Sequence, residues 1–407
     1  MSEYIKNVEL KTPYYMFYAD EFAENYKKLE SAFQSIYPKY QIAYSFKTNY
    51  TPAVCEEVRR LGGYAEVVSD MEYMLAKKTG FVDKHIIYNG PGKGKFFETC
   101  ILNRGLLNVD NMSEIDRVCR IADSNKKVEI KVGIRVNFDI GNAIHSRFGL
   151  DSENDDFQKA LNKLRRKNVC VQGVHFHISQ ARELGFWEKR IEKLLAIVSK
   201  HFQNGLSYID IGSGMFGQMD EGLHKQFNNV PTYDEYAGVV AKAMADYYNG
   251  IPENKKPVLI TEPGATLISK YVHLFSSVLD IKEIRGRKFA LLDCSIHNAG
   301  EICRLKKVPV RVIGVNGKEA QKYDAIDFVG YTCLEQDCLY KNYAGRLAIG
   351  DLVEFSNVGG YSVVLKPPFI HADIPAYMLQ LDNVTCIKRA QTFEDIFAPY
   401  YFEGKGE

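Results

Sequence analysis

The feature that most constrains this chain is the regular alternation of short apolar runs with amphipathic helical stretches between residues 20 and 265. The runs expected to form strands are 40–46, 64–68, 85–89, 106–110, 128–136, 169–177, 206–211 and 257–262. Helices are expected at 20–37, 51–62, 98–103, 113–122, 156–166, 186–202 and 233–248. Alternating strands and helices favour parallel strands joined by crossover helices. Eight such units predict a (β/α)8 barrel, with a doubly wound open sheet as the alternative.

The alternation ends after Gly264, where apolar runs follow one another with short turns and few helices. Strands are expected at 271–281, 289–292, 308–315, 327–331, 352–357 and 362–365. This pattern is typical of a mostly antiparallel β domain, to which residues 11–18 are expected to add a strand. The predicted domains are therefore a barrel over 20–268 and a β domain made of 1–19 and 269–407, an α/β architecture overall.

Composition narrows the class of protein. The chain has 407 residues, 46% of them hydrophobic, and a net charge of +1, which gives no sign of a nucleic-acid or membrane partner. No apolar run approaches the roughly 20 residues of a membrane helix, and the N-terminus lacks an apolar signal core. The nine cysteines form no Cys-x-x-Cys pair, which argues against a zinc ribbon. A cytoplasmic protein is expected.

Polar residues and glycines gather where the predicted strands end. In strand order they are Lys47; Glu66, Ser69 and Glu72; Asn89–Lys93; Asp110; Arg135 and Asn137; His175–Ser179; Asp210–Gly214; and Thr261–Gly264. The carboxyl ends of barrel strands form the rim that carries active sites. The sequence therefore predicts an enzyme.

Two of these residues indicate a kind of chemistry. A lysine that ends a buried strand, as Lys47 does, is costly unless it is paired or used, and a partly neutral amine is the nucleophile of Schiff-base chemistry. The alternative is a lysine that extends to solvent. Glu262 ends an apolar strand and needs a partner, for which a protonated ring nitrogen would serve.

The glycine turn at 212–214 and the pair His175 and His177 give further indications of the chemistry at these strand ends. Gly212 and Gly214 would let backbone N–H groups approach a phosphate, although an ordinary tight turn has the same sequence. His175 and His177 alternate along a strand and face the same side, but no third residue is spaced to complete a metal site. No metal is predicted, and stacking on a flat ring is the better use for one of them.

Taken in order, these segments resemble the fold-type III pyridoxal-phosphate decarboxylases, which include ornithine, biosynthetic arginine and diaminopimelate decarboxylases; alanine racemases share the fold. Tyr44–Asn49, Phe176–Ser179, Asp210–Gly214 and Glu262–Gly264 carry the resemblance within the barrel. It implies pyridoxal 5'-phosphate as cofactor. The implied site residues are Lys47 as the Schiff-base lysine, Glu66 beside it, His177 stacked on the ring, Ser179, Gly212, Ser213 and Gly214 at the phosphate, and Glu262 at the pyridine nitrogen.

The β domain carries two further similar segments, Gly330–Asp337 and Gly359–Tyr361. They imply Cys333 as proton donor to the product, Tyr361 at the phosphate, and Glu335 and Asp337 at the substrate. In the family the cysteine reaches into the neighbouring subunit's site. The resemblance thus implies a homodimer with shared active sites.

The reaction follows from the residue at the ring nitrogen. A glutamate there, as Glu262 would be, keeps the nitrogen protonated and the ring a strong electron sink. In the racemase branch an arginine usually takes this place, so decarboxylation of an amino acid is predicted over the alternative of a racemase or epimerase. A non-catalytic regulator, or a metal-dependent hydrolase that uses His175 and His177, would also fit such a barrel.

Two positions depart from the family pattern. Diaminopimelate decarboxylases usually carry an arginine directly after Glu-Pro-Gly, where this chain has Ala265, and a glutamate directly after the cysteine, where it has Leu334 with Glu335 one residue later. Such changes are expected to alter the substrate, towards a specialised biosynthetic pathway and an amino-acid derivative that is conjugated or carrier-bound. The sequence leaves open whether His145, Arg147 or Arg135 contacts the phosphate or the ring.

Overall fold

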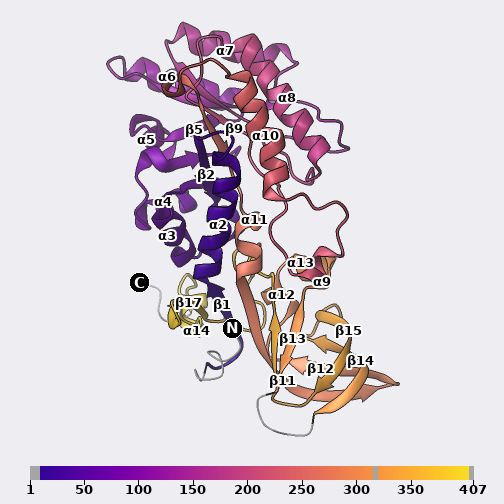
Figure 1. The fold of residues 1–407 in the computed structure, drawn as a ribbon. Coiled ribbons are helices and arrows are strands. Elements are labelled where there is room, and N and C mark those ends of the chain that lie inside the picture. The colour runs from indigo at the N-terminus through magenta and orange to yellow at the C-terminus, as the bar shows by residue number, and fades with distance from the viewer. Residues whose placement is uncertain (1–9, 315–319, 403–407) are drawn as a thin grey trace. The chain divides into compact units, whose positions relative to one another are not determined.

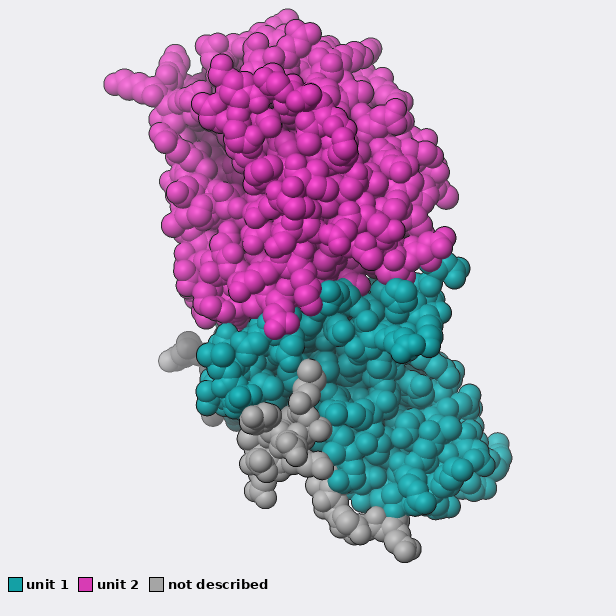
Figure 2. Space-filling model, in the orientation of Figure 1, with its two compact units in different colours: residues 1–22, 218–228, 267–407 teal, residues 23–217, 229–266 magenta. Residues whose placement is uncertain are grey.

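The computed structural model describes residues 10–314 and 320–402. The end of the predicted strand 308–315 and both chain ends lie outside these residues. The chain divides into two compact units, coloured separately in Figure 2: unit 1 contains 1–22, 218–228 and 267–407, and unit 2 contains 23–217 and 229–266.

Unit 2 is built on eight parallel strands that close into a barrel. In spatial order they are β5 (Leu106–Val109), β4 (Ile86–Tyr88), β3 (Tyr64–Val67), β2 (Tyr40–Ser45), β10 (Val258–Thr261), β9 (Tyr208–Asp210), β8 (Cys170–His175) and β6 (Lys131–Asn137). Pairing of β5 with β6 closes the ring, and the two-residue β7 (Leu150–Asp151) adds to β6. The predicted barrel is therefore confirmed, and the open sheet is wrong.

Helices connect these strands and surround them in Figure 1. The longer ones are α2 (Ala19–Gln34), α3 (Pro52–Arg60), α4 (Asp70–Lys78), α5 (Phe96–Leu102), α6 (Met112–Ser124), α7 (Asp155–Arg166), α8 (Leu184–His201) and α10 (Tyr233–Tyr247). Their starts follow from capping side chains: Ser69, Asn111 and Asn154 each accept a backbone N–H, and Thr232 with Glu235 forms a capping box. The sequence prediction omits α4.

One tyrosine fills the middle of the barrel. The ring of Tyr208 occupies space that Gly133 and Gly173 leave open, because a Cβ at Gly173 would lie 2.2 Å from the Tyr208 ring. The Tyr208 hydroxyl donates to Asn108 Oδ1 at 2.6 Å. The hydroxyl therefore reaches the polar residues of the barrel, and the apolar part of the side chain packs against Ala43, Ile87 and Ile260.

Unit 1 contains a mostly antiparallel sheet, as predicted. Its order is β15 (Cys338–Leu347), β14 (Gln321–Val329), β12 (Arg287–Leu292), β11 (Val272–Ile284), β1 (Tyr14–Tyr18), β17 (Ala376–Gln380) and β18 (Asn383–Lys388), with β16 (Leu352–Phe355) joining β11 to β13 (Val310–Ile313). The N-terminal β1 pairs antiparallel with β11 and parallel with β17.

The prediction for this sheet is wrong in places. Residues 363–365 form the 3-10 helix η5 rather than a strand, and η5 begins two residues after Tyr361, whose φ of +58° turns the chain. The strands β15, β17 and β18 are absent from the prediction. The helices of the region are short: α12 (Ile296–Ala299), α13 (Ile302–Leu305) and α14 (Phe393–Phe397). Among the described residues, no helix has the length and apolarity needed to cross a membrane.

Candidate active site

Lys47 lies directly after β2, in the one-turn helix η1 (Phe46–Thr48). Its Nζ is 2.5 Å from Glu66 Oε2 and 2.6 Å from Ser45 Oγ, and Ser45 Oγ donates to the same carboxylate oxygen at 2.5 Å. Glu66 is buried, whereas the Lys47 side chain is 34% exposed. The amine is thus fixed by a buried acceptor and still accessible, as a reactive amine requires.

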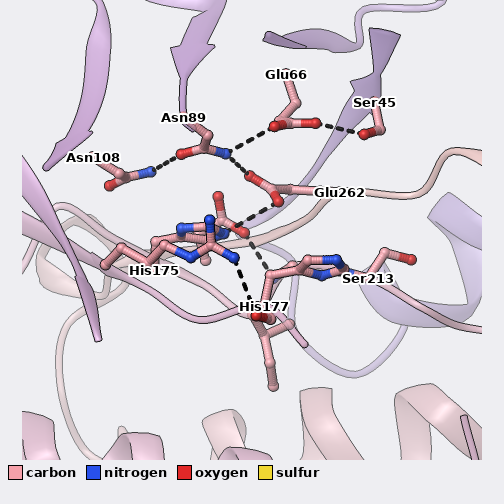
Figure 3. Close-up of polar contacts among 12 residues, drawn as sticks. Ser45, Glu66, Asn89, Asn108, His175, His177, Ser213 and Glu262 are labelled. Carbon is pink, nitrogen blue, oxygen red and sulfur yellow. Dashed lines mark hydrogen bonds and ion pairs between the residues drawn. The ribbon is translucent and has the colours of Figure 1, made fainter. Parts of the chain in front are cut away.

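A chain of amides joins this carboxylate to a second one, as Figure 3 shows. Asn89 Nδ2 donates to Glu66 Oε1 at 3.1 Å and to Glu262 Oε1 at 2.5 Å. Asn108 Nδ2 donates to Asn89 Oδ1 at 2.9 Å, which fixes the orientation of the Asn89 amide. Glu66 and Glu262 are therefore held by a shared donor at the rim of the barrel.

Glu262 is surrounded by further groups that decide its charge. His175 Nε2 lies 3.2 Å from Glu262 Oε2, and the ligand atoms of His175, Asp210 and Glu262 all lie within 4.8 Å of one another. Burial alone would raise the pKa of Glu262, but interactions with His175 and Lys47 outweigh it and hold that pKa well below its usual range. Burial, and next the charge of Glu262, raises the pKa of Asp210 well above its usual range. Glu262 is thus the ionised member of the pair and Asp210 the protonated one.

His177 and the glycine turn meet next to this group. His177 Nδ1 accepts the backbone N–H of Ser213 at 3.2 Å, so its proton is on Nε2. Burial, and next the charge of Lys47, lowers the pKa of His177 well below its usual range, and the ring is neutral. Gly212 and Gly214 have φ of +63° and +110°, and a Cβ at Gly212 would lie 2.7 Å from the His177 Cβ. Only glycine fits this turn beside the imidazole.

A buried arginine completes the rim. Arg135 Nη1 lies 3.5 Å from Asp110 Oδ1, and Nη2 donates to the carbonyl oxygen of His177 at 3.2 Å. Its guanidinium also lies 4.6 Å from the Phe148 ring. Arg135 therefore supports the His177 backbone. His145 and Arg147 lie on the loop before Phe148, and Arg147 lies over the Phe148 ring at 4.3 Å.

The comparisons with known proteins decide the family. The family model for the pyridoxal binding domain of pyridoxal-dependent decarboxylases matches residues 20–269. The chain belongs to the pyridoxal-dependent decarboxylases. Relatives include diaminopimelate decarboxylase of Aquifex aeolicus, 25% identical over 97% of this chain and 95% of that protein, and that of Methanocaldococcus jannaschii, 25% identical over 95% and 90%.

Solved structures of the family share the fold. The diaminopimelate decarboxylase of Helicobacter pylori complexed with L-lysine superposes with a TM-score of 0.81 at 21% identity, covering 96% of this chain and 97% of that one. The enzyme of M. jannaschii gives 0.83 at 22% identity, covering 97% and 93%. The family match and the relatives, rather than the shared fold, show that this chain is an amino-acid carboxy-lyase that uses pyridoxal phosphate.

The residues of the decarboxylase barrel fit this cofactor. Lys47 offers an accessible amine, Glu262 an ionised carboxylate for the ring nitrogen, and His177 a neutral flat ring. At Gly212 a side chain would collide with His177, so only glycine lets the turn pass this close to the imidazole. The predicted Ser179 is exposed, two residues beyond His177. The structure thus brings Lys47, Glu66, His177, the 212–214 turn and Glu262 together in one unit.

The remaining predicted residues of the decarboxylase lie in unit 1. Cys333 and Glu335 are exposed on the loop between β14 and β15. Asp337 is buried, and its two oxygens accept the backbone N–H groups of Ile296 at 2.7 Å and Thr332 at 3.0 Å. Asp337 thus connects this loop to α12, and its expected contact with the substrate stays a prediction.

Sequence reasoning misses several residues of the decarboxylase site. It gives Asn89 and Asp210 only as polar strand ends and leaves Asn108 out, yet the two asparagines connect the carboxylate network and Asp210 is its protonated carboxyl group. Asn89 and Asp210 carry a signal, because each is a polar residue at or just beyond the end of an apolar strand; Asn108 is the one polar residue within the strand β5. Arg190 carries no such signal, because it stands in the charged run Glu188–Arg190 of a helix.

Proposed function

We propose that this enzyme removes the α-carboxylate of an amino acid with the barrel residues in the roles expected from the sequence. The buried Glu262, held by Asn89 and lying 3.2 Å from His175 Nε2, is the observation that carries the proposal. When bound, pyridoxal phosphate supplies an electron sink for the charge left on Cα as carbon dioxide leaves. A carboxylate that holds a proton on the pyridine nitrogen strengthens this sink.

Lys47 is the residue that would hold the cofactor. Glu66 Oε2 accepts from both Lys47 and Ser45, so it can take a proton from the amine and return it. Neutral His177 provides a flat face for the ring, and the fixed Ser213 N–H keeps that face in position. Ser179 and the 212–214 turn provide hydroxyl and backbone donors for the phosphate.

The same residues argue against a racemase. An amino-acid racemase or epimerase must hold a proton ready on each side of Cα while the carboxylate stays, and a weaker sink suits it. Glu262 is held ionised by His175 and Lys47, which favours the stronger sink. The racemase therefore remains only the second candidate.

In unit 1 we assign Cys333 as the proton donor at Cα and Tyr361 as a phosphate contact, each acting in the site of a second copy of the chain. Support for a homodimer comes from apolar side chains left exposed near the Cys333 loop: Leu334 is 41%, Phe369 36% and Ile370 53% exposed. The rings of Tyr331 and His371 pack at 4.2 Å, so the segments carrying these side chains are neighbours. Contiguous exposed apolar residues mark interaction surfaces.

We further propose domain limits at 20–268 for the barrel and at 1–19 with 269–407 for the β domain, and a cytoplasmic location. The family match to 20–269 supports the first limit.

The substrate is proposed to differ from free meso-diaminopimelate. No charged side chain follows Gly264, because Ala265 stands there, and Leu334 follows Cys333 with its side chain exposed. Glu335 is the exposed acidic side chain of the loop and is assigned to the substrate's far end. An amino-acid derivative, conjugated or carrier-bound, fits a site that has lost a polar contact at each of two positions.

The test is incubation of the enzyme and pyridoxal phosphate in heavy water with meso-diaminopimelate, lysine, ornithine, arginine and their conjugates, followed by mass spectrometry. A product that has lost carbon dioxide and gained one deuterium at Cα is expected from a derivative. Normal turnover of free meso-diaminopimelate would contradict the altered substrate. Deuterium uptake without loss of mass would identify a racemase.

A further inference from the structure

A buried cation lies behind the predicted phosphate turn and is not used by the reaction. Arg190 is on α8, and its side chain is fully buried. It rests on the Trp187 ring at 4.1 Å. Burying a cation costs free energy unless hydrogen bonds compensate its charge. The groups that contact the guanidinium therefore indicate why an arginine is present here.

In the part of the chain that the structure describes, the hydrogen bonds of Arg190 all go to main-chain carbonyl oxygens. Nη1 donates to Ile211 O at 3.4 Å and Ser213 O at 3.1 Å. Nη2 donates to Ile178 O and Ala181 O, both at 3.4 Å. Among the described residues no carboxylate pairs with Arg190, so its charge is compensated by carbonyl dipoles and by the Trp187 ring. Burial lowers the pKa of Arg190 to about 9, which leaves the guanidinium charged near pH 7.

These four carbonyls belong to two loops, 178–181 and 211–213, and those loops carry Ser179 and the glycine turn. In a trans peptide the C=O and the following N–H point in opposite directions. A carbonyl of Ser213 directed at Arg190 therefore turns the N–H of Gly214 away from it, and the carbonyl of Ile178 does the same for Ser179. Within residues 10–314 and 320–402, neither N–H is found in a backbone hydrogen bond of a turn or loop.

We propose that Arg190 is a positioning residue for the cofactor phosphate: it holds the two loops so that the N–H groups of Ser179 and Gly214 face the anion, and it adds a buried positive charge behind them. The planar guanidinium, with donors on both Nη atoms, spans two loops at once, which a lysine amine cannot do. The inference rests on the proposed assignment of the 212–214 turn to the phosphate.

The test compares ligands with and without a phosphate. Dissociation constants of pyridoxal 5'-phosphate and of pyridoxal are measured by absorbance titration for wild type, Arg190→Met and Arg190→Lys. Because Arg190→Met removes charge-assisted hydrogen bonds, we expect it to raise the dissociation constant of pyridoxal 5'-phosphate about 10-fold or more. The dissociation constant of pyridoxal should change about 2-fold at most. Arg190→Lys retains the charge, so its dissociation constant for pyridoxal 5'-phosphate should lie between those of wild type and Arg190→Met.

Arg117→Met is the matched control. Arg117 on α6 also donates to two carbonyls, Lys93 O at 3.0 Å and Gly94 O at 2.7 Å, and lies over the Phe97 ring at 4.2 Å. Its loop is not assigned to the phosphate, so its replacement should leave the ratio of the two constants unchanged. If Arg190→Met left the ratio of the two dissociation constants unchanged, whether or not both ligands bound more weakly, the proposal would be overturned.

A measurement on wild type keeps the proposal testable if the variants do not fold. Inorganic phosphate should slow hydrogen exchange of the backbone at 178–182 and 211–215, and absence of protection would contradict the anion cradle. Failure of wild type to bind pyridoxal 5'-phosphate would contradict the proposed function itself. Binding that is unaffected by Arg190→Met would contradict only the role of Arg190.

Discussion

In the barrel unit, the polar residues assigned to the cofactor are mostly buried and connected; in the β unit, those assigned to protonation and substrate choice are mostly exposed and unconnected. Glu66, Asn89 and Glu262 share hydrogen bonds and are buried, whereas Cys333 and Glu335 are exposed. A buried network fixes protonation states before any ligand arrives, while an exposed loop can change its side chains without unfolding the domain. The positions where the chain departs from the family around Cys333 lie in that loop.

The strongest test of the barrel side is Lys47→Ala. Removing the amine that would hold the cofactor should lower the decarboxylation rate roughly 10³-fold or more, without loss of fold. Lys39→Ala is the matched control, because Lys39 stands just before the same strand and donates to Lys256 O. Rates and far-UV circular dichroism of both variants are compared. Retention of most activity by Lys47→Ala would break the assignment.

The next test separates the two facing carboxyl groups. Glu262→Gln removes an ionised group and should slow decarboxylation about 100-fold. Asp210→Asn replaces a carboxyl that is already protonated by a neutral group of the same shape, so the rate at pH 7 should change only a few fold. Steady-state kcat for both variants checks this. Equal losses would show that the charge is not on Glu262.

On the side of the β unit, Cys333→Ser should lower kcat about 10- to 100-fold through poorer proton donation at Cα, while affinity for pyridoxal 5'-phosphate stays unchanged. Cys386→Ser, an exposed cysteine of β18, is the control. The readout is kcat together with the dissociation constant of the cofactor. If Cys333→Ser weakened binding of the cofactor as strongly as it lowered kcat, the assignment of cofactor binding to the barrel and of protonation to the β unit would be contradicted.

The same contrast explains what the sequence can predict. Barrel strands such as β10 are short, mostly apolar and mostly buried runs bounded by glycine or polar residues, so β10 is predicted at 257–262 and found at Val258–Thr261. The strand β15, with Lys341, Gly345 and Arg346, is missed because it lies at the edge of its sheet and most of its residues are exposed or half-buried. Pairing with β14, rather than a local apolar pattern, makes this segment a strand.

For the site, the motifs at strand ends predict Lys47, His177 and Glu262, because the barrel places every strand end at one rim. They cannot predict which carboxyl is protonated, since this depends on Asp210, Glu262 and His175 meeting within 4.8 Å. Nor can they predict Arg190, whose function depends on carbonyls from two loops that precede and follow it in sequence. Charge states and the contacts that support the site residues are properties of the assembled barrel.

The smallest expected effect concerns stability. Glu72, at the third position of α4, accepts the Val68 N–H at 2.6 Å, and burial raises its pKa to about 7 from 4.5. The folded state therefore holds this proton more tightly than the unfolded state, so stability falls as pH rises from about 4.5 to 7. Glu72→Gln should remove this loss, so that its free energy of unfolding in urea gains on the order of 1 kcal/mol relative to wild type between pH 5 and 7.5.

The control is Glu235, at the same position of α10, which has a lowered pKa because it accepts the Thr232 N–H. Its stabilisation is present above its unfolded pKa and is lost as pH falls, so Glu235→Gln should show no such gain. A gain in both variants would mean that helix capping in general, rather than burial of Glu72 in the barrel, sets the pH dependence.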